Sequence, residues 1–227
     1  MGETRTKLPR MRKMIGDAML KSITTIPQAS GFTTVDCTGM LNYLARMEQE
    51  GHKISSTVYL CKCVAMALEL HPNMNSRLEG DEIVVYDSIN AGIGVDMGDS
   101  LIVVVLKDLQ KKPVLEINEQ FHELMGRVKT KKITMDDITG GTFTISNMSK
   151  RTRYSAFNSI VTNSEAFILG MSGIVKQAVV DENDNIVVRP CTNLTMNINH
   201  TLVDGATSTR FSTQMFDFFE NPEECFY

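Results

Sequence analysis

The sequence predicts an α/β protein built as one domain over residues 1–227. Stretches whose apolar residues recur every three or four positions, as in helices, are interspersed with stretches in which apolar and polar residues alternate, as in strands. Hydrophobic residues make up 42% of the chain and charged residues 22%, a balance from which a sizeable core can be buried. No repeat, low-complexity tract or Pro/Ala-rich linker divides the sequence.

Along the first half of the chain, the pattern predicts a helix, a strand, two further helices and a hairpin. The last of these helices is largely apolar and ends at His71-Pro72, because the residue before a proline is disfavoured in helical geometry. The hairpin turns at Gly80-Asp81. The predicted elements occupy, in order, residues 9–22, residues 31–36, a helix marked by Leu41, Leu44 and Met47, residues 58–70 and residues 77–86.

The second half predicts a strand, a helix, a hairpin, a strand and a final helix. The first strand is apolar on both faces, which predicts a place in the interior of a sheet. The last strand has Met196 and Ile198 on one face and Asn197 and Asn199 on the other, and an Asp-Gly pair separates it from the final amphipathic helix. These elements occupy residues 101–106, 115–128, 175–180 with 186–189, 195–199 and 206–219.

The composition argues against several functional classes. A net charge of −4 and a pI near 5.6 disfavour electrostatic binding of nucleic acid. No apolar run has membrane-spanning length and the N-terminus lacks the apolar core of a signal peptide, so we expect a cytoplasmic protein without membrane contact. Five cysteines, an odd number, indicate free thiols in a reducing compartment. Cys61 and Cys63 face different directions on a helix, so they predict no metal site.

The most informative motif is His-x-x-x-Asp-Gly, formed by His200, Asp204 and Gly205. It directly follows the strand predicted at residues 195–199. A histidine held at the end of a buried strand, four residues from a carboxylate, suits a general base whose position is fixed by the backbone. The alternative is a strand-end histidine followed by an Asp-Gly turn and a helix cap.

A second motif lies about fifty residues earlier, Gly-Gly-Thr-Phe-Thr-Ile-Ser-Asn-Met at residues 140–148. Together the two motifs resemble the catalytic domain of the dihydrolipoamide acyltransferases, the core component of 2-oxoacid dehydrogenase complexes. That family shares its fold with the chloramphenicol acetyltransferases, which implies a two-layer sandwich with a mixed β-sheet packed by helices. The resemblance runs nearly end to end, through residues 7–15, 25–28, 71–75, 93–96, 101–105, 166–170 and 186–190.

Acyl transfer between thiols has two chemical requirements. A thiol is mostly protonated at neutral pH, so a neutral imidazole must take its proton as the sulfur attacks the thioester. The attack produces a tetrahedral oxyanion, which needs a fixed hydrogen-bond donor. The resemblance implies that His200 is the general base and that Ser146 is the donor. Without the resemblance, a strand serine bonded to neighbouring backbone is the preferred interpretation of Ser146.

The resemblance implies that Asp204 belongs to the catalytic residues and that its role is mainly structural. In the acetyltransferase relatives the matching carboxylate pairs with an arginine near the N-terminus, and Arg12 stands at the corresponding place here. A buried Asp204–Arg12 pair would hold the loop that carries His200. The alternative for Arg12 is a solvated helix face. Gly205 is expected to permit the tight departure from strand to helix.

The resemblance also implies substrates and partners. Coenzyme A, as acyl-CoA, is the expected donor, and a homotrimer with sites between subunits is the expected active species; assembly into a larger core is left open. We find no lipoylation hairpin in this sequence, so we expect a lipoyl-bearing partner protein or a different thiol acceptor. The terminal aromatics Phe226 and Tyr227 are expected to dock on their own core or on another subunit.

Departures from the family keep two further hypotheses open. The family usually has Asp before the histidine and Arg after it, where this chain has Asn199 and Thr201. Asn163-Ser164 replace a common Pro-Pro pair, and Ser149 replaces a Gly. The alternatives are therefore a chloramphenicol-acetyltransferase-like enzyme acting on a small hydroxyl or amine, and a catalytically quiet trimeric scaffold.

Overall fold

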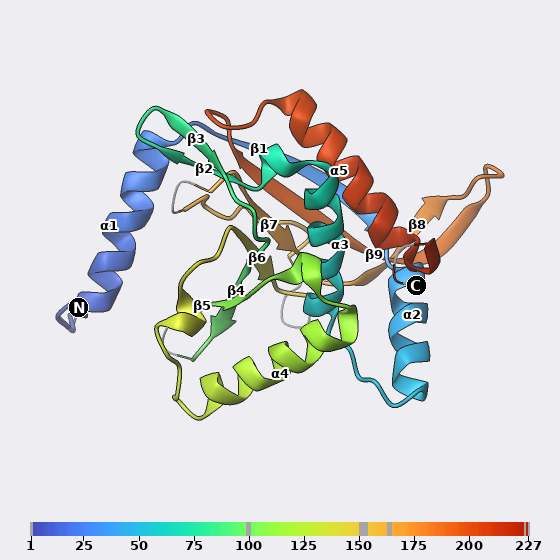
Figure 1. Cartoon of the computed structure of the whole chain (residues 1–227), viewed down its shortest axis with the longest axis horizontal. Helices are drawn as coiled ribbons and strands as arrows, with labels where there is room; N and C mark the ends of the chain where they lie inside the picture. The colour runs from blue at the N-terminus through green and yellow to red at the C-terminus, as the bar shows by residue number, and fades with distance from the viewer. Residues whose placement is uncertain (1, 99–100, 150–153, 163–164, 225, 227) are drawn as a thin grey trace.

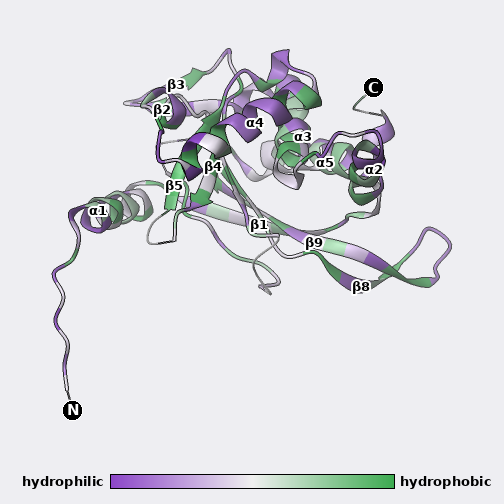
Figure 2. Ribbon diagram, turned by 90° about the horizontal axis from the view of Figure 1, so that it is seen from below, coloured by the Kyte–Doolittle hydropathy of each residue, from purple (hydrophilic) through white to green (hydrophobic). Residues whose placement is uncertain are grey.

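The computed structural model describes residues 2–98, 101–149, 154–162, 165–224 and 226. They form a mixed β-sheet with α2, α3, α4 and α5 on one side of it (Figure 1, Figure 2). The helices are α1 (Arg10–Thr25), α2 (Thr38–Gln49), α3 (Ser56–Leu70), α4 (Val114–Lys129) and α5 (Gly205–Glu220). The main sheet contains β1 (Gln28–Asp36), β4 (Ala91–Asp96), β5 (Leu101–Leu106), β6 (Phe143–Asn147), β7 (Phe167–Met171), β8 (Val175–Val180) and β9 (Ile186–Asn199).

The strands of the main sheet follow the order β1-β9-β7-β6-β4-β5, and β8 also pairs with β9. The β4–β6 and β6–β7 pairs are parallel, whereas the remaining pairs are antiparallel. A separate hairpin consists of β2 (Ser76–Glu79) and β3 (Glu82–Val85), as predicted. The two-layer α/β prediction is therefore confirmed, with each predicted helix present and its ends within three residues of the prediction.

Two predicted strands differ from the structure. Residues 101–106 form an edge strand, β5, and not an interior one, because β4 is its only partner in the described sheet. Leu101 and Val103 are correspondingly 59% and 38% exposed, whereas the second half of the strand is buried. The strands predicted at 186–189 and 195–199 are parts of the single strand β9. Pro190 is tolerated within it because pairing with β1 begins only at the next residue.

The core lies between the sheet and its helix layer. α3 is buried over most of its length, as its apolar sequence predicts. Its Tyr59 hydroxyl donates a 2.7 Å hydrogen bond to the carbonyl oxygen of Phe219, where α5 ends. The Phe226 ring packs on Tyr43 and Tyr59, with centroids 5.2 and 5.0 Å apart, so docking of this aromatic on its own core is confirmed. Tyr227 lies outside the described residues.

α1 stands apart from the other helices and projects from the body of the protein (Figure 2). Ser22 is the one buried residue of this helix, and its hydroxyl donates to the carbonyl oxygen of Val161. Several large apolar residues at its surface are more than half exposed: Met11, Met14, Leu20 and Ile23. Among the residues that the structure describes, no helix has both the length and the apolar character needed to cross a membrane.

Close packing of α2 against the end of α5 makes a glycine necessary at position 39. A Cβ atom on Gly39 would lie 2.0 Å from the backbone oxygen of Glu220. We predict that Gly39→Ala lowers the free energy of unfolding by about 1–3 kcal/mol, because backbone must shift to admit the methyl group. Gly126→Ala is the matched control: no atom lies within 4 Å of its Cβ position on α4, so helix propensity should raise stability by up to about 1 kcal/mol. Urea denaturation of both variants measures the difference, and equal stabilities would contradict the packing.

Candidate active site

Ser146 lies on the face of the sheet opposite the helix layer. Its neighbours in sequence, Ile145 and Phe143, alternate with it and belong to the core. In the strand register, Ser146 stands opposite Gly170 on β7, and Gly170 stands opposite Thr195 on β9. Directly opposed residues share a face, so these three residues form one row across the sheet.

A segment without regular secondary structure, residues 154–162, lies over this face; we refer to it as the covering segment. Side chains of β9 hold it, because the Asn193 and Asn197 amides donate to the backbone oxygens of Ser155 and Ser159. Its Phe157 ring lies directly above Gly170, since a Cβ atom at that glycine would be 2.9 Å from the ring. Phe157 therefore covers the residue that stands opposite Ser146 on the neighbouring strand. No feature of the sequence alone identified this phenylalanine, because its contact joins segments that have no common periodicity.

His200 follows the last residue of β9, as the sequence predicts. Its backbone N–H donates a 2.8 Å hydrogen bond to the carbonyl oxygen of Pro27. The preceding residue, Asn199, shapes the turn: its backbone oxygen accepts from Leu202 and Val203, and its Oδ1 accepts from the Thr201 N–H at 3.1 Å. Asn199 is 1% exposed, whereas His200 is exposed. Backbone hydrogen bonds thus fix the main chain of His200, and its side chain is exposed to solvent.

One chain does not bring Ser146 and His200 together. The residue of β9 in the Ser146 row is Thr195, which is five residues before His200. At about 3.4 Å per residue along β9 and about 4.8 Å for each of the two strand spacings, the two positions are about 20 Å apart. A hydrogen-bond donor and a base that act on the same thioester must both lie within a few ångströms of it. In this conformation, the Ser146 and His200 of one chain are therefore too far apart to act on the same thioester.

Within one chain, the structure does not form the expected Asp204–Arg12 pair. Asp204 is exposed and caps α5, with its Oδ1 accepting a 2.7 Å hydrogen bond from the Thr207 N–H. This bond lowers the pKa of the Asp204 carboxyl from its ordinary value. Arg12 is exposed on α1, and the ion pairs of the described residues include none between these two side chains. The Asp204 carboxylate accepts from a backbone N–H in the first turn of α5 that has no partner within the helix. α1, which carries Arg12, projects from the body of the protein (Figure 2).

Gly205 also differs from expectation. It begins α5 with a negative φ, and no atom lies within 4 Å of the place that a Cβ would occupy. A side chain would therefore fit at this position, and the strand-to-helix connection does not depend on glycine. The Asp204 cap and the hydrogen bonds to Asn199 define the turn instead.

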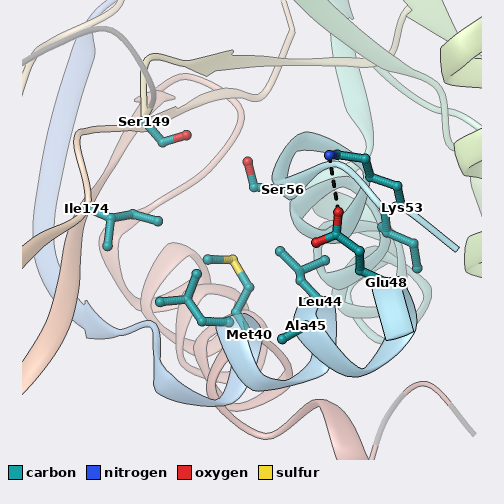
Figure 3. A pocket seen from close by; sticks show the side chains of 10 residues that line it. Met40, Leu44, Ala45, Glu48, Lys53, Ser56, Ser149 and Ile174 are labelled. Atoms are coloured by element: carbon teal, nitrogen blue, oxygen red, sulfur yellow. Dashed lines mark ion pairs between the residues drawn. The ribbon is translucent and has the colours of Figure 1, made fainter. Parts of the chain in front are cut away.

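A hollow of about 320 Å³ adjoins the end of β6 (Figure 3). Asn147, the residue after Ser146, connects β6 to the start of α3 because its amide donates to Thr57 Oγ1 at 3.1 Å. Ser149, two positions further, lines the hollow together with Ser56. Lys53 and Glu48 form a 3.2 Å ion pair at one side of it. The other lining residues are Met40, Leu41, Leu44, Ala45, Ile54 and Ile174.

The structure provides no candidate metal centre among the residues that it describes, because nowhere do three His, Cys, Asp or Glu side chains gather. The four cysteines described, at positions 37, 61, 63 and 191, are buried and not joined in disulfides. Of the side chains that the sequence singled out, Ser146 offers a hydroxyl and His200 an imidazole, and amide side chains lie near both.

The architecture and sequence both resemble known acyltransferases. A lipoamide acyltransferase component of the branched-chain alpha-keto acid dehydrogenase complex from Bacillus subtilis is 33% identical over 98% of this chain and 54% of its own length. The chain thus spans about half the length of the curated relatives that it matches. A probable dihydrolipoamide acetyltransferase from Listeria monocytogenes superposes with a TM-score of 0.89 at 30% identity, covering 96% of this chain and 95% of the other.

A chloramphenicol acetyltransferase superposes with a TM-score of 0.56 at 16% identity, over 88% of this chain and 92% of the other. This likeness confirms the predicted two-layer fold. Residues 1–227 match the sequence profile of the 2-oxoacid dehydrogenases acyltransferase (catalytic domain). With the whole sequence matched, the chain belongs to the family of 2-oxoacid dehydrogenase acyltransferase catalytic domains.

Proposed function

We propose that the chain transfers an acyl group between coenzyme A and a thiol acceptor such as dihydrolipoamide. The observation that carries this proposal is the fixed placement of Ser146 and His200 in a chain of an acyltransferase family. These are the hydroxyl donor and the imidazole base that transfer between thiols requires. The lipoyl group is proposed to belong to another polypeptide, or to a part of a longer chain outside these residues.

The proposed reaction has two proton transfers. Neutral His200 takes the proton of the attacking thiol while its sulfur bonds to the thioester carbon, which gives a tetrahedral oxyanion. The Ser146 hydroxyl donates a hydrogen bond to this oxyanion, where negative charge develops. The oxyanion collapses, the other carbon–sulfur bond breaks, and the imidazolium returns its proton to the departing thiolate. Atoms and charge balance without a further reactant.

The hollow at the end of β6 is lined mainly by residues of the helix layer, and it is our proposed place for the arm of coenzyme A, whose thioester would pass the strand end to reach Ser146. Its apolar walls suit the methylene groups of pantetheine, and Lys53 at its side suits a phosphate. The Lys53–Glu48 pair is mostly exposed, so exchanging it for a phosphate contact costs little. Phe157, which covers the residue opposite Ser146, is the proposed surface on which the acyl group packs.

We further propose that His200 of one subunit acts with Ser146 of a neighbour in a homotrimer. The separation of about 20 Å within one chain supports a site shared between chains. Exposed apolar residues on α1 and on the edge strand β5 support contact between subunits, because such surfaces are normally covered. A larger core of trimers is compatible with this arrangement and is not required by it.

The altered neighbours of His200 favour one alternative, transfer to a small hydroxyl or amine. Asn199 and Thr201 leave the surroundings of the imidazole without the charges usual in the family. A panel of acetyl-CoA and longer acyl-CoAs, offered with dihydrolipoamide, chloramphenicol and simple alcohols or amines, distinguishes the acceptors. Absence of turnover with every pair would instead favour a trimeric scaffold.

We predict that His200→Ala lowers kcat/KM by about 10²–10⁴-fold, because a positioned base contributes that much. Ser146→Ala should lower kcat by about 10²-fold with little change in the KM for acyl-CoA, because its bond strengthens in the transition state. His122→Ala, which removes an exposed imidazole from α4, is the matched control and should retain activity. Steady-state assays of folded proteins decide, and a His200→Ala enzyme within tenfold of the unmodified one would contradict the base assignment.

Mixing the two inactive variants tests the shared site. Under conditions of subunit exchange, some interfaces would combine the intact His200 of a Ser146→Ala chain with the intact Ser146 of a His200→Ala chain. We predict partial recovery of activity in the mixture and none in either variant alone. Exchange is verified independently with differently tagged subunits. Demonstrated exchange without recovery, or an active species that sediments as a monomer, would exclude the shared site.

A further inference from the structure

Glu165 is a buried carboxyl that the proposed transfer chemistry does not use. It lies two residues before β7, is 6% exposed, and its backbone forms a bridge with Arg77 of β2. Its Oε2 is 2.9 Å from Thr144 Oγ1 on β6. Its Oε1 is 3.4 Å from the backbone nitrogen and 3.5 Å from Oγ1 of Thr162. One side chain thus joins β6 to the last residue of the covering segment.

These contacts lie close to Ser146. Thr144 is two residues before Ser146 on β6, so both side chains are on the same face of the sheet, about 7 Å apart along the strand. The next strand leaves room for the contact, because Gly92 stands opposite Thr144 and a Cβ there would be 3.3 Å from Thr144 Oγ1. At its other end the connection reaches Thr162, in the segment that places Phe157 over Gly170.

Among the residues that the structure describes, no cation forms an ion pair or a hydrogen bond with the Glu165 carboxyl. The elements packed around it bring two titratable side chains nearby, Arg77 from β2 and Tyr86 after β3. The Arg77 guanidinium is already bonded to Glu79 and lies 5.0 Å above the Tyr86 ring. The hydrogen-bond partners of the carboxyl itself, Thr144 and Thr162, are uncharged, and Glu165 is the only acidic or basic residue among those that line the adjoining hollow.

Enclosure without a cation favours the neutral acid. Burial raises the pKa of Glu165 to about 8, although the hydrogen bonds from Thr144 and Thr162 act in the opposite direction. A protonated carboxyl has one O–H to donate, and either threonine oxygen can accept it. A hollow of about 300 Å³ beside the carboxyl gives water a route to the group when it ionises.

We propose that Glu165, as an uncharged carboxylic acid, is a positioning residue for Ser146, because it holds β6 and the covering segment together. Ionisation places a charge in this enclosed site, and the cost of burying that charge exceeds what the stronger bonds from Thr144 and Thr162 return. Hydration of the carboxylate from the hollow then competes with the closed arrangement and loosens the connection between β6 and the covering segment. The hydroxyl of Ser146 and the ring of Phe157 then lose their fixed relation. The inference rests on the proposed acyl transfer for its activity readout, but the effect on folding is independent of it.

The experiment compares the unmodified protein with Glu165→Gln, an isosteric amide that donates and accepts like the neutral acid but cannot ionise. kcat and KM are measured from pH 6 to 9.5 in both proteins, and the ratio of their kcat values cancels the pH effects that the two proteins share. We expect a constant ratio of kcat values below about pH 7. Above it, kcat of the unmodified protein should fall relative to the variant by up to about tenfold at pH 9, where about nine-tenths of Glu165 is ionised. KM should change little.

Thr144→Val provides a matched second variant. It removes a hydrogen bond that favours the charged carboxylate, so the relative fall in kcat should move to higher pH. A ratio of kcat values between the unmodified protein and Glu165→Gln that is constant over the whole range would overturn the positioning role. A Thr144→Val profile that coincides with that of the unmodified protein would also contradict it.

Thermal melts provide a readout that needs no catalysis. The carboxyl ionises near its ordinary pKa of 4.5 in the unfolded chain but holds its proton to about pH 8 in the folded one. The folded state therefore binds more protons between these values, and stability falls as the pH rises through that window. Relative to Glu165→Gln, the melting temperature should decline from pH 5 to 8 and then level off. Coincident melting curves across pH would refute an uncharged Glu165, whereas absence of any transferase activity would count against the proposed function alone.

Discussion

The register of β9 is the constraint on which the rest of the structure depends. This strand pairs with β1, β7 and β8, and its alternation directs Met196 and Ile198 into the helix-covered core while Thr195, Asn197 and Asn199 face the covering segment. A slip of one residue would exchange the two faces, and would bury asparagines in the apolar core. The same register fixes the row that contains Ser146 and ends the strand at His200. Core packing and the geometry of the site are thus set by one set of backbone hydrogen bonds.

Local periodicity was sufficient to predict the helices, the two hairpins and the alternation of β9, because these are properties of neighbouring residues. It could not predict the covering segment, whose contacts are made by the amides of Asn193 and Asn197 to backbone 38 residues away. Local periodicity also predicted that β5 is an interior strand, because an apolar run does not show whether the residues that cover it belong to the same chain. The motifs single out Ser146 and His200 as candidates, whereas no local pattern shows that Asp204 caps α5 and is not paired with Arg12 in the same chain.

Two buried carboxyls show how strongly a bound cation changes the pKa of such a group. Arg127 donates to both oxygens of Asp137, at 3.1 and 2.7 Å, and this contact lowers the Asp137 pKa to about 2. Glu165 has threonine hydroxyls in place of a guanidinium, and its pKa is raised. Asp137 can therefore keep its charge at any physiological pH and anchor its loop to α4. The protonation of Glu165, in contrast, depends on pH, and this residue lies beside the strand that carries Ser146.

A division of the site between chains would explain why each half is rigid on its own. Ser146 lies within the sheet, beside the glycine that Phe157 covers, and His200 is held by the bonds of Pro27 and Asn199, so neither can travel about 20 Å to meet the other. Groups held in fixed positions, such as Ser146 and His200, can stabilise one transition state only when a second folded subunit brings them together. The exposed apolar residues of α1 and β5 then have a physical purpose, since the surface that is unfavourable in a single chain supplies the free energy that assembles the site. Assembly and activity would depend on the same surfaces, and a substitution that weakens subunit contact should lower activity without touching Ser146 or His200.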